Sequence, residues 1–324
     1  MRAALVLALL ASPALAGVED AVEQHILPAV KAFAETTEAL AEAAQADCAA
    51  IALRPAYQAA WEAWSPIADI RLGPSEAAAL TIAYWPDERG AGAKALRGLL
   101  VSEDAALRDP AAFAEVSAAA RGFPALDLLL GDPELSSYEE GSPGCALVRT
   151  VAADLAAQAE ALAQGWAAEA EALTTAGASG NARYLTEDEA TRAIYTQLLS
   201  GLEFTADTRL GRPLGEPDRP RPTRAEFWRS DRPLPNALAS VESAAQIAMD
   251  LADRPLPATE AALDQVRRAA ASIDDPSFQD LEDPQARLEV EILQQRIRVL
   301  LDAIEAEVGA SLGLQPGFNS RDGD

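Results

Sequence analysis

Few residues of this chain could carry catalytic chemistry. Among 324 residues there is one histidine, His25, and the residue three positions later is Pro28. His25 therefore has no glutamate at the spacing that lets two side chains share a metal ion on one helical face. Zinc hydrolases normally use histidine ligands with a carboxylate base, and a Ser-His-Asp arrangement would also have to use His25. The sequence has no Gly-x-Ser-x-Gly elbow and no glycine-rich phosphate loop, so nucleophilic catalysis finds no support.

The most informative stretch is Gly122 to Asp127, which reads Gly-Phe-Pro-Ala-Leu-Asp. Positions 124 and 127 would share one helical face, but Pro124 has no ligand atom. Asp127 precedes three leucines, and a carboxylate beside an apolar run needs a cation, donors or water. Asp127 is either a weak metal ligand or polar anchor in a cleft, or a capping or helix-surface carboxylate. A transition-metal site commonly needs three or four ligands, whereas a hard-cation site built from Asp and Glu oxygens stays open.

A second group of candidates lies earlier, in an irregular segment rich in proline and glycine. Arg71 could hold a carboxylate with two parallel hydrogen bonds, and Trp85 could form the wall of a pocket. The alternative is an internal Arg71–Asp87 ion pair that fixes two loops. The candidate pocket residues of this segment are Arg71, Gly73, Pro74, Trp85 and Asp87.

A third group lies in the second half of the chain. Glu203 and Arg209 flank the end of an apolar helix, where they either face a cleft or pair along the helix. Trp228, Arg229 and Ser230 either close a cleft from the second half or only pack within a loop. The 211–236 segment contains six prolines and six arginines and is locally about +2, within a chain of net charge −25.

Helical periodicity accounts for the elements that must position these residues. Apolar residues recur at three- and four-residue steps over 22–40, 147–166 and 288–308, and no stretch alternates as a strand does. Thr186 and Glu189 form a capping box, Ser142-Pro143 is a start signal, and Asp283-Pro284 opens the last long helix. The pattern predicts an all-α protein of two helical bundles, with long irregular Pro/Gly-rich loops at their junction. The cluster of Gly, Pro and Ser at 131–144 places the boundary, which gives an N-terminal bundle over 17–140 and a C-terminal bundle over 141–324.

Residues 1–16 have the features of a secretory signal peptide. Arg2 supplies the positive start, an apolar run follows, and Ala14-Leu15-Ala16 is a small-x-small cleavage site. No later segment is long and apolar enough to span a bilayer, so we expect a periplasmic protein without a membrane span. An even count of two cysteines, Cys48 and Cys145, then predicts one disulfide. The acidic surface disfavours nucleic-acid binding.

Several segments together resemble the imelysin-like family of bacterial envelope proteins. Arg71-Leu72-Gly73-Pro74, Tyr84-Trp85-Pro86-Asp87 and the 228–236 segment resemble family segments, as does the tail from Gly317 to Asp324. The 122–127 stretch is similar to the family's Gly-x-His-x-x-Glu signature, with Pro124 at the His position and Asp127 at the Glu position. The resemblance implies two facing helical bundles with this motif at their junction.

The resemblance leaves three functions to weigh. The first is a periplasmic, non-catalytic binding protein linked to iron or metal acquisition, with its ligand in the cleft between the bundles. That ligand is a small molecule, a metal chelate or another envelope protein of iron uptake. The second is a metallopeptidase, as the family's older name implies, and the third is an interaction module that uses the arginine-rich loop. The cofactor stays open between iron, another divalent cation and none.

Overall fold

A computed structural model describes residues 17–102, 105–252, 254–310 and 312–313. Helices form the regular structure of these residues, and the described part of the chain has no strand, only an isolated bridge between Glu216 and Arg219. The predicted all-α class is therefore confirmed. The predicted signal peptide and the tail from Gly317 to Asp324 lie outside the described residues.

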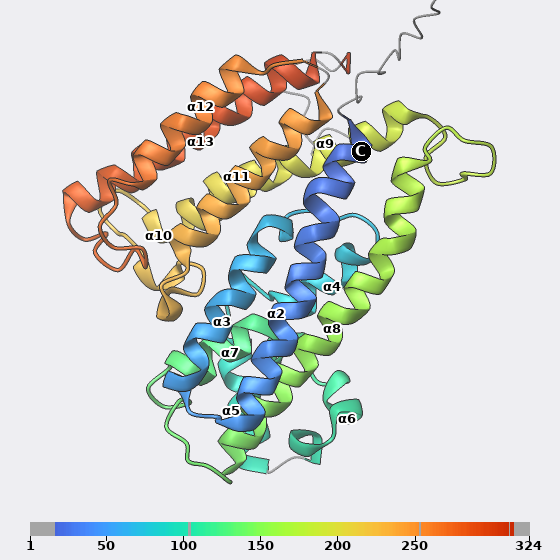
Figure 1. The fold of residues 1–324 in the computed structure, drawn as a ribbon. Helices are drawn as coiled ribbons and strands as arrows, with labels where there is room; N and C mark the ends of the chain where they lie inside the picture. The colour runs from blue at the N-terminus through green and yellow to red at the C-terminus, as the bar shows by residue number, and fades with distance from the viewer. Residues whose placement is uncertain (1–16, 103–104, 253, 311, 314–324) are drawn as a thin grey trace, which may run out of the picture.

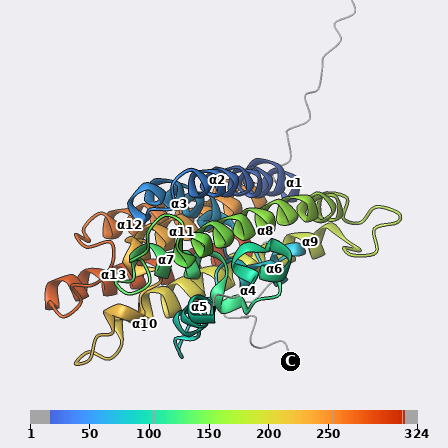
Figure 2. The same cartoon turned by 90° about the horizontal axis from the view of Figure 1, so that it is seen from below.

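The first group of helices is built around α2 (Leu27–Ala46), which follows the short α1 (Val18–Asp20) and a π-helical turn, Ala21–Ile26. It packs against α3 (Ala50–Trp64) and α8 (Pro143–Thr174), as Figures 1 and 2 show. The predicted apolar stripe faces this contact, since its members are all buried: Val22, Ile26, Val30, Phe33, Thr37 and Leu40. The 3.6-residue period thus correctly predicted the buried face of α2.

Shorter helices complete the first group. They are α4 (Pro74–Ile82), α5 (Ala91–Ser102), α6 (Pro110–Ala114) and α7 (Gly122–Gly131). Phe123 at the start of α7 stacks on Trp61 of α3 with ring centroids 4.0 Å apart, and Trp61 also contacts Phe227 from the second half of the chain. This aromatic cluster anchors α7 between the two halves.

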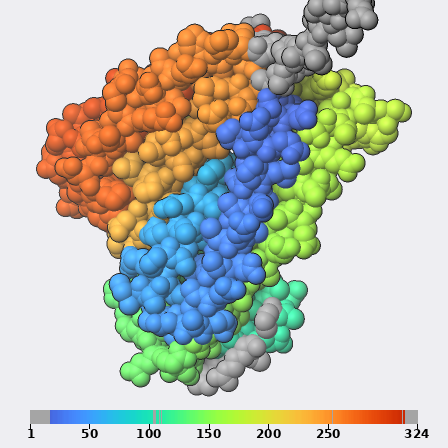
Figure 3. Space-filling model, in the orientation of Figure 1, coloured from blue at the N-terminus to red at the C-terminus, as the bar shows by residue number. Residues whose placement is uncertain are grey.

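The second group contains α9 (Glu187–Phe204), the short α10 (Gly211–Leu214), α11 (Pro233–Leu251), α12 (Pro257–Ala270) and α13 (Pro284–Ile304). The predicted start signals cap these helices. Thr186 accepts a hydrogen bond from the Glu189 N–H at the start of α9, and Asp283 accepts two backbone N–H hydrogen bonds at the start of α13. Figure 3 shows the orange surface of this group directly against the blue surface of the N-terminal helices.

The predicted disulfide joins Cys48, just before α3, to Cys145 in the first turn of α8, with Cα atoms 5.5 Å apart. It closes a loop across 97 positions and so contributes about 4 kcal/mol in the chain-entropy description. The bond fixes the end of α2 and the start of α3 beside α8.

The predicted boundary between residues 140 and 141 separates α8 from helices on which it packs. α8 lies along α2 and also contacts α7 and α4, whereas its contact with α9 is small. We propose instead that the boundary falls after Thr174, so that α8 closes the first bundle. In this proposal, the glycines and prolines at 131–144 connect α7 to α8 within one bundle.

Candidate functional site

A cavity of about 300 Å³ lies where the two groups of helices meet. Three parts of the chain line it: the 84–93 segment, one face of α7, and, from the second half, Arg212 together with the 223–229 segment. Six of the residues singled out in the sequence are brought together here: Trp85, Asp87, Pro124, Asp127, Trp228 and Arg229. Its size is at the lower end of the range for small-molecule sites.

Asp127 is the buried carboxylate of this cavity, with 3% of its surface exposed. Its Oδ1 accepts a hydrogen bond of 2.6 Å from the Ser230 hydroxyl, and its Oδ2 lies 3.8 Å from Nη1 of Arg229. Burial raises the pKa of Asp127 to about 6, although the Ser230 hydrogen bond and the Arg229 charge lower it. Asp127 is therefore a polar anchor that ties α7 to the loop of the second half.

The side chains around Asp127 do not suit a metal ion. Pro124 supplies no ligand atom, one Asp127 oxygen is taken by Ser230, and a cation near the other would face the positive charge of Arg229. Among the described residues, one group of three side chains lies close enough to share a metal ion: Cys48, Glu140 and Cys145. The sulfurs of Cys48 and Cys145 are bonded to each other in the disulfide, so they are not free thiolate ligands.

The elevated pKa of Asp127 makes stability depend on pH in a defined direction. The unfolded carboxyl titrates near 3.9, so between about pH 4 and 6 the folded state binds the additional proton. The contribution of Asp127 to stability therefore falls as pH rises through this window. For Asp127→Asn, we expect the free energy of unfolding to rise relative to wild type by roughly 2 kcal/mol between pH 4 and pH 7. Urea denaturation of both proteins at each pH measures this difference, and a difference independent of pH contradicts it.

A tight turn of the second half presents residues to Asp127. Phe227 and Asp231, at either end of the 228–230 turn, both have left-handed backbone, with φ of 48° and 55°. Such conformations cost about 1–2 kcal/mol for residues with a side chain. The Ser230 hydroxyl bond to Asp127 and a 2.7 Å hydrogen bond from the Gln58 amide to the Ser230 carbonyl hold the turn in place.

Two arginines lie over tryptophan rings on the walls of the cavity. The Arg212 guanidinium lies 6.0 Å from the Trp85 ring, and that of Arg229 lies 4.5 Å from the Trp228 ring. Arg212 also pairs with Glu88 at 2.9 Å. Arg229 reaches Asp132 at 3.3 Å in addition to Asp127.

The anticipated Arg71–Asp87 ion pair is not among the contacts of the described residues. The Asp87 carboxylate instead caps α5, since it accepts hydrogen bonds from the backbone N–H groups of Ala91 and Gly92 at 2.9 and 2.8 Å. Arg71 donates its backbone N–H to Gln197 at 2.9 Å, and burial lowers the pKa of its guanidinium. Asp87 thus fixes the cavity wall through α5 and not through Arg71.

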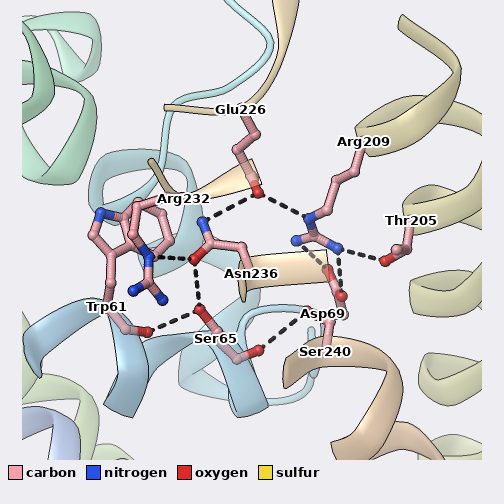
Figure 4. Close-up of polar contacts among 9 residues, drawn as sticks. All are labelled: Trp61, Ser65, Asp69, Thr205, Arg209, Glu226, Arg232, Asn236 and Ser240. Carbon is pink, nitrogen blue, oxygen red and sulfur yellow. Dashed lines mark hydrogen bonds and ion pairs between the residues drawn. The ribbon is translucent and has the colours of Figure 1, made fainter. Parts of the chain in front are cut away.

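Arg209 belongs to a buried network beside the cavity, shown in Figure 4. Its guanidinium donates to Asp69 at 2.7 and 3.0 Å, to Glu226 at 3.1 Å and to Thr205 at 2.8 Å. Burial lowers the pKa of Arg209, but the two carboxylates outweigh this and leave it above its ordinary value. With these donors in use, Arg209 joins the two halves of the chain and does not line the cavity.

Asn236 extends the same network into α11. It donates to Glu226 at 3.3 Å and accepts from Arg232 at 2.9 Å, while Ser65 at the end of α3 lies 3.2 Å from it. Ser240 then donates to the Ser65 carbonyl at 3.2 Å. The junction between the two groups of helices is therefore a connected set of polar contacts.

The remaining candidates have other positions. Gly73 and Pro74 pack on α8, where a Cβ on Gly73 would lie 2.5 Å from Glu169 and a Cβ on Gly165 would lie 2.8 Å from Pro74. Gly122 packs against the last carbonyls of α4. Glu203 lies in a different surface hollow, between α9 and α13.

Sequence reasoning missed partners that are distant in the chain. Asp69 and Glu226, which hold Arg209, and Gln58, which holds Ser230, were not predicted. No local pattern signals them, because Asp69 and Arg209 are 140 positions apart.

The helical fold, with a cavity at the 122–127 stretch between two groups of helices, defines an imelysin-like scaffold. The family model described as Imelysin matches residues 26–304, so the chain belongs to the imelysin family. Among solved structures, an imelysin-like protein from Psychrobacter arcticum 273-4 superposes with a TM-score of 0.74 at 18% identity, covering 93% of this chain and 96% of that one. A protein from Parabacteroides distasonis ATCC 8503 is described as an iron-regulated protein A precursor. It superposes with a TM-score of 0.69 at 13% sequence identity, covering 92% of this chain and 97% of that one. No curated protein matches the chain.

Among the described residues, no helix combines the length and the apolar character that a membrane span requires.

Proposed function

We propose that this chain is a non-catalytic binding protein of the bacterial periplasm that takes part in metal acquisition. Its ligand occupies the cavity beside Asp127, where the two groups of helices meet. The observation that carries the proposal is that both halves of the chain line one cavity with charged and aromatic side chains. The signal-peptide features of residues 1–16 support export.

A binding role is favoured over a peptidase role by the side chains themselves. The position that carries histidine in the family signature is Pro124, and the chain's one histidine, His25, pairs with Asp250 on α11 at 2.7 Å. A hydrolytic zinc ion would lack its usual ligands, and within the described parts of the chain no serine or cysteine has a histidine base. Both cysteines are in the disulfide.

The link to metal comes from the family. One structural neighbour is described as an iron-regulated protein A precursor. Because Arg229 faces Asp127, we propose that the metal arrives as a complex with an organic acid and not as a bare ion. The carboxylates of such a complex would meet the arginines of the wall.

Calorimetric titration tests this function. The ligands are ferric citrate, ferric salicylate, and bare ferrous, cupric and zinc ions. We expect wild type to bind at least one ferric complex. Ala93→Trp adds a bulky side chain to the cavity wall, so this variant should lose that binding. Lys94→Trp is the matched control, because Lys94 is exposed on the same helix and does not line the cavity. Binding of neither complex, or equal binding by Ala93→Trp, contradicts the proposal.

A further inference from the structure

We infer that the cavity beside Asp127 selects an aromatic carboxylate, that is, a flat ring that carries an anionic group. This inference rests on the proposed function and specifies the chemistry of its ligand. Two observations lead to it: an arginine on the wall is left without an ion-pair partner among the described residues, and four aromatic side chains line the cavity.

The acidic side chains of the wall already have partners. Asp87 accepts backbone N–H groups at the start of α5, and Glu88 pairs with Arg212 at 2.9 Å. Asp127 is held by Ser230 and faces Arg229. A cationic ligand would have to break these contacts, so the wall does not suit one.

Donors, in contrast, remain available. Arg224 lines the cavity and is exposed to solvent. Its guanidinium has no ion-pair partner in the described parts of the chain. A guanidinium presents parallel N–H groups that match the two oxygens of a carboxylate. The wall can therefore satisfy an anion without losing any of its present contacts.

The aromatic part of the wall determines the rest of the ligand. Tyr84, Trp85, Phe227 and Trp228 all line the cavity. They come from both halves of the chain, so a flat group between them would contact both groups of helices. Aromatic rings prefer such offset-stacked or edge-to-face neighbours, which are worth about 0.5–1.5 kcal/mol beyond the area buried. A volume of about 300 Å³ accommodates a ligand of one or two rings.

Three metal-free probes separate the two features: 2-naphthoate, the uncharged 2-naphthylmethanol, and the non-aromatic cyclohexanecarboxylate. Calorimetry on the disulfide-intact protein is expected to show binding of 2-naphthoate, with each other probe at least tenfold weaker. Arg224→Gln should weaken 2-naphthoate about tenfold and leave 2-naphthylmethanol unchanged. Arg219→Gln is the matched control, because Arg219 is exposed in the same loop and does not line the cavity.

The outcomes distinguish the ligand class from the function. Equal binding of the three probes, or an equal effect of Arg219→Gln and Arg224→Gln, overturns the aromatic-carboxylate assignment. If 2-naphthoate does not bind while ferric citrate binds wild type but not Ala93→Trp, the assignment is wrong and the binding function stands. If no probe and no ferric complex binds, both proposals fall.

Discussion

Replacing Arg209 with methionine is expected to destabilise the folded protein by about 3–5 kcal/mol. The substitution removes the charge that Asp69 and Glu226 share and leaves both carboxylates largely buried, with 15% and 5% of their side chains exposed. Removing one partner of a buried ion pair costs more than the pair contributes, because the remaining charge is left without compensation. Urea denaturation, followed by circular dichroism, measures the loss.

Two further variants test this explanation. Arg298 also pairs with a carboxylate, Asp207 at 2.9 Å, but both side chains are exposed, so Arg298→Met should cost less than about 1 kcal/mol. Adding Asp69→Asn and Glu226→Gln to Arg209→Met should recover a large part of the lost stability, because the uncompensated charges are then gone. Equal effects of Arg209→Met and Arg298→Met refute the role assigned to Arg209.

Arg209 also shows where prediction from sequence reached its limit. Periodicity and capping signals are local, so the sequence correctly predicted the buried stripe of α2 and the starts of α8, α9 and α13. Arg209 was recognised as a candidate, but its partners were not. Its role depends on how the two halves of the chain pack, and no local pattern contains that information.

The candidate site was predictable to a similar degree. The resemblance of the 122–127 and 84–87 segments to family segments led to residues that share one cavity: Trp85, Asp87, Pro124 and Asp127. The same resemblance also pointed to Gly73, Pro74 and Gly122, which pack against neighbouring elements. A glycine or proline that fixes the backbone and one that lines a pocket look the same in sequence. Only the contacts separate the two cases.

Gly122→Ala is the second substitution with a large expected effect, about 2–5 kcal/mol of lost stability. Gly122 has a φ of 64°, which costs a residue with a side chain about 1–2 kcal/mol. A Cβ there would also lie 2.2 Å from the carbonyl oxygen of Ile82 and 2.4 Å from that of Thr81. These are backbone atoms of α4 and cannot turn aside as a side chain could, so α7 must shift relative to α4.

Gly90→Ala separates the conformational cost of the positive φ from the steric cost of the added Cβ. Gly90 has nearly the same backbone, with a φ of 63°, but a Cβ there would meet no atom within 4 Å. Gly90→Ala should therefore lose only the conformational part, about 1–2 kcal/mol. Similar losses in the two variants would contradict the steric explanation. A larger loss for Gly122→Ala, accompanied by weaker binding of the ferric complex that wild type binds, is the expected result. The shift of α7 would then displace Asp127 and the cavity wall together, because the close approach of α7 to α4 fixes the position of both.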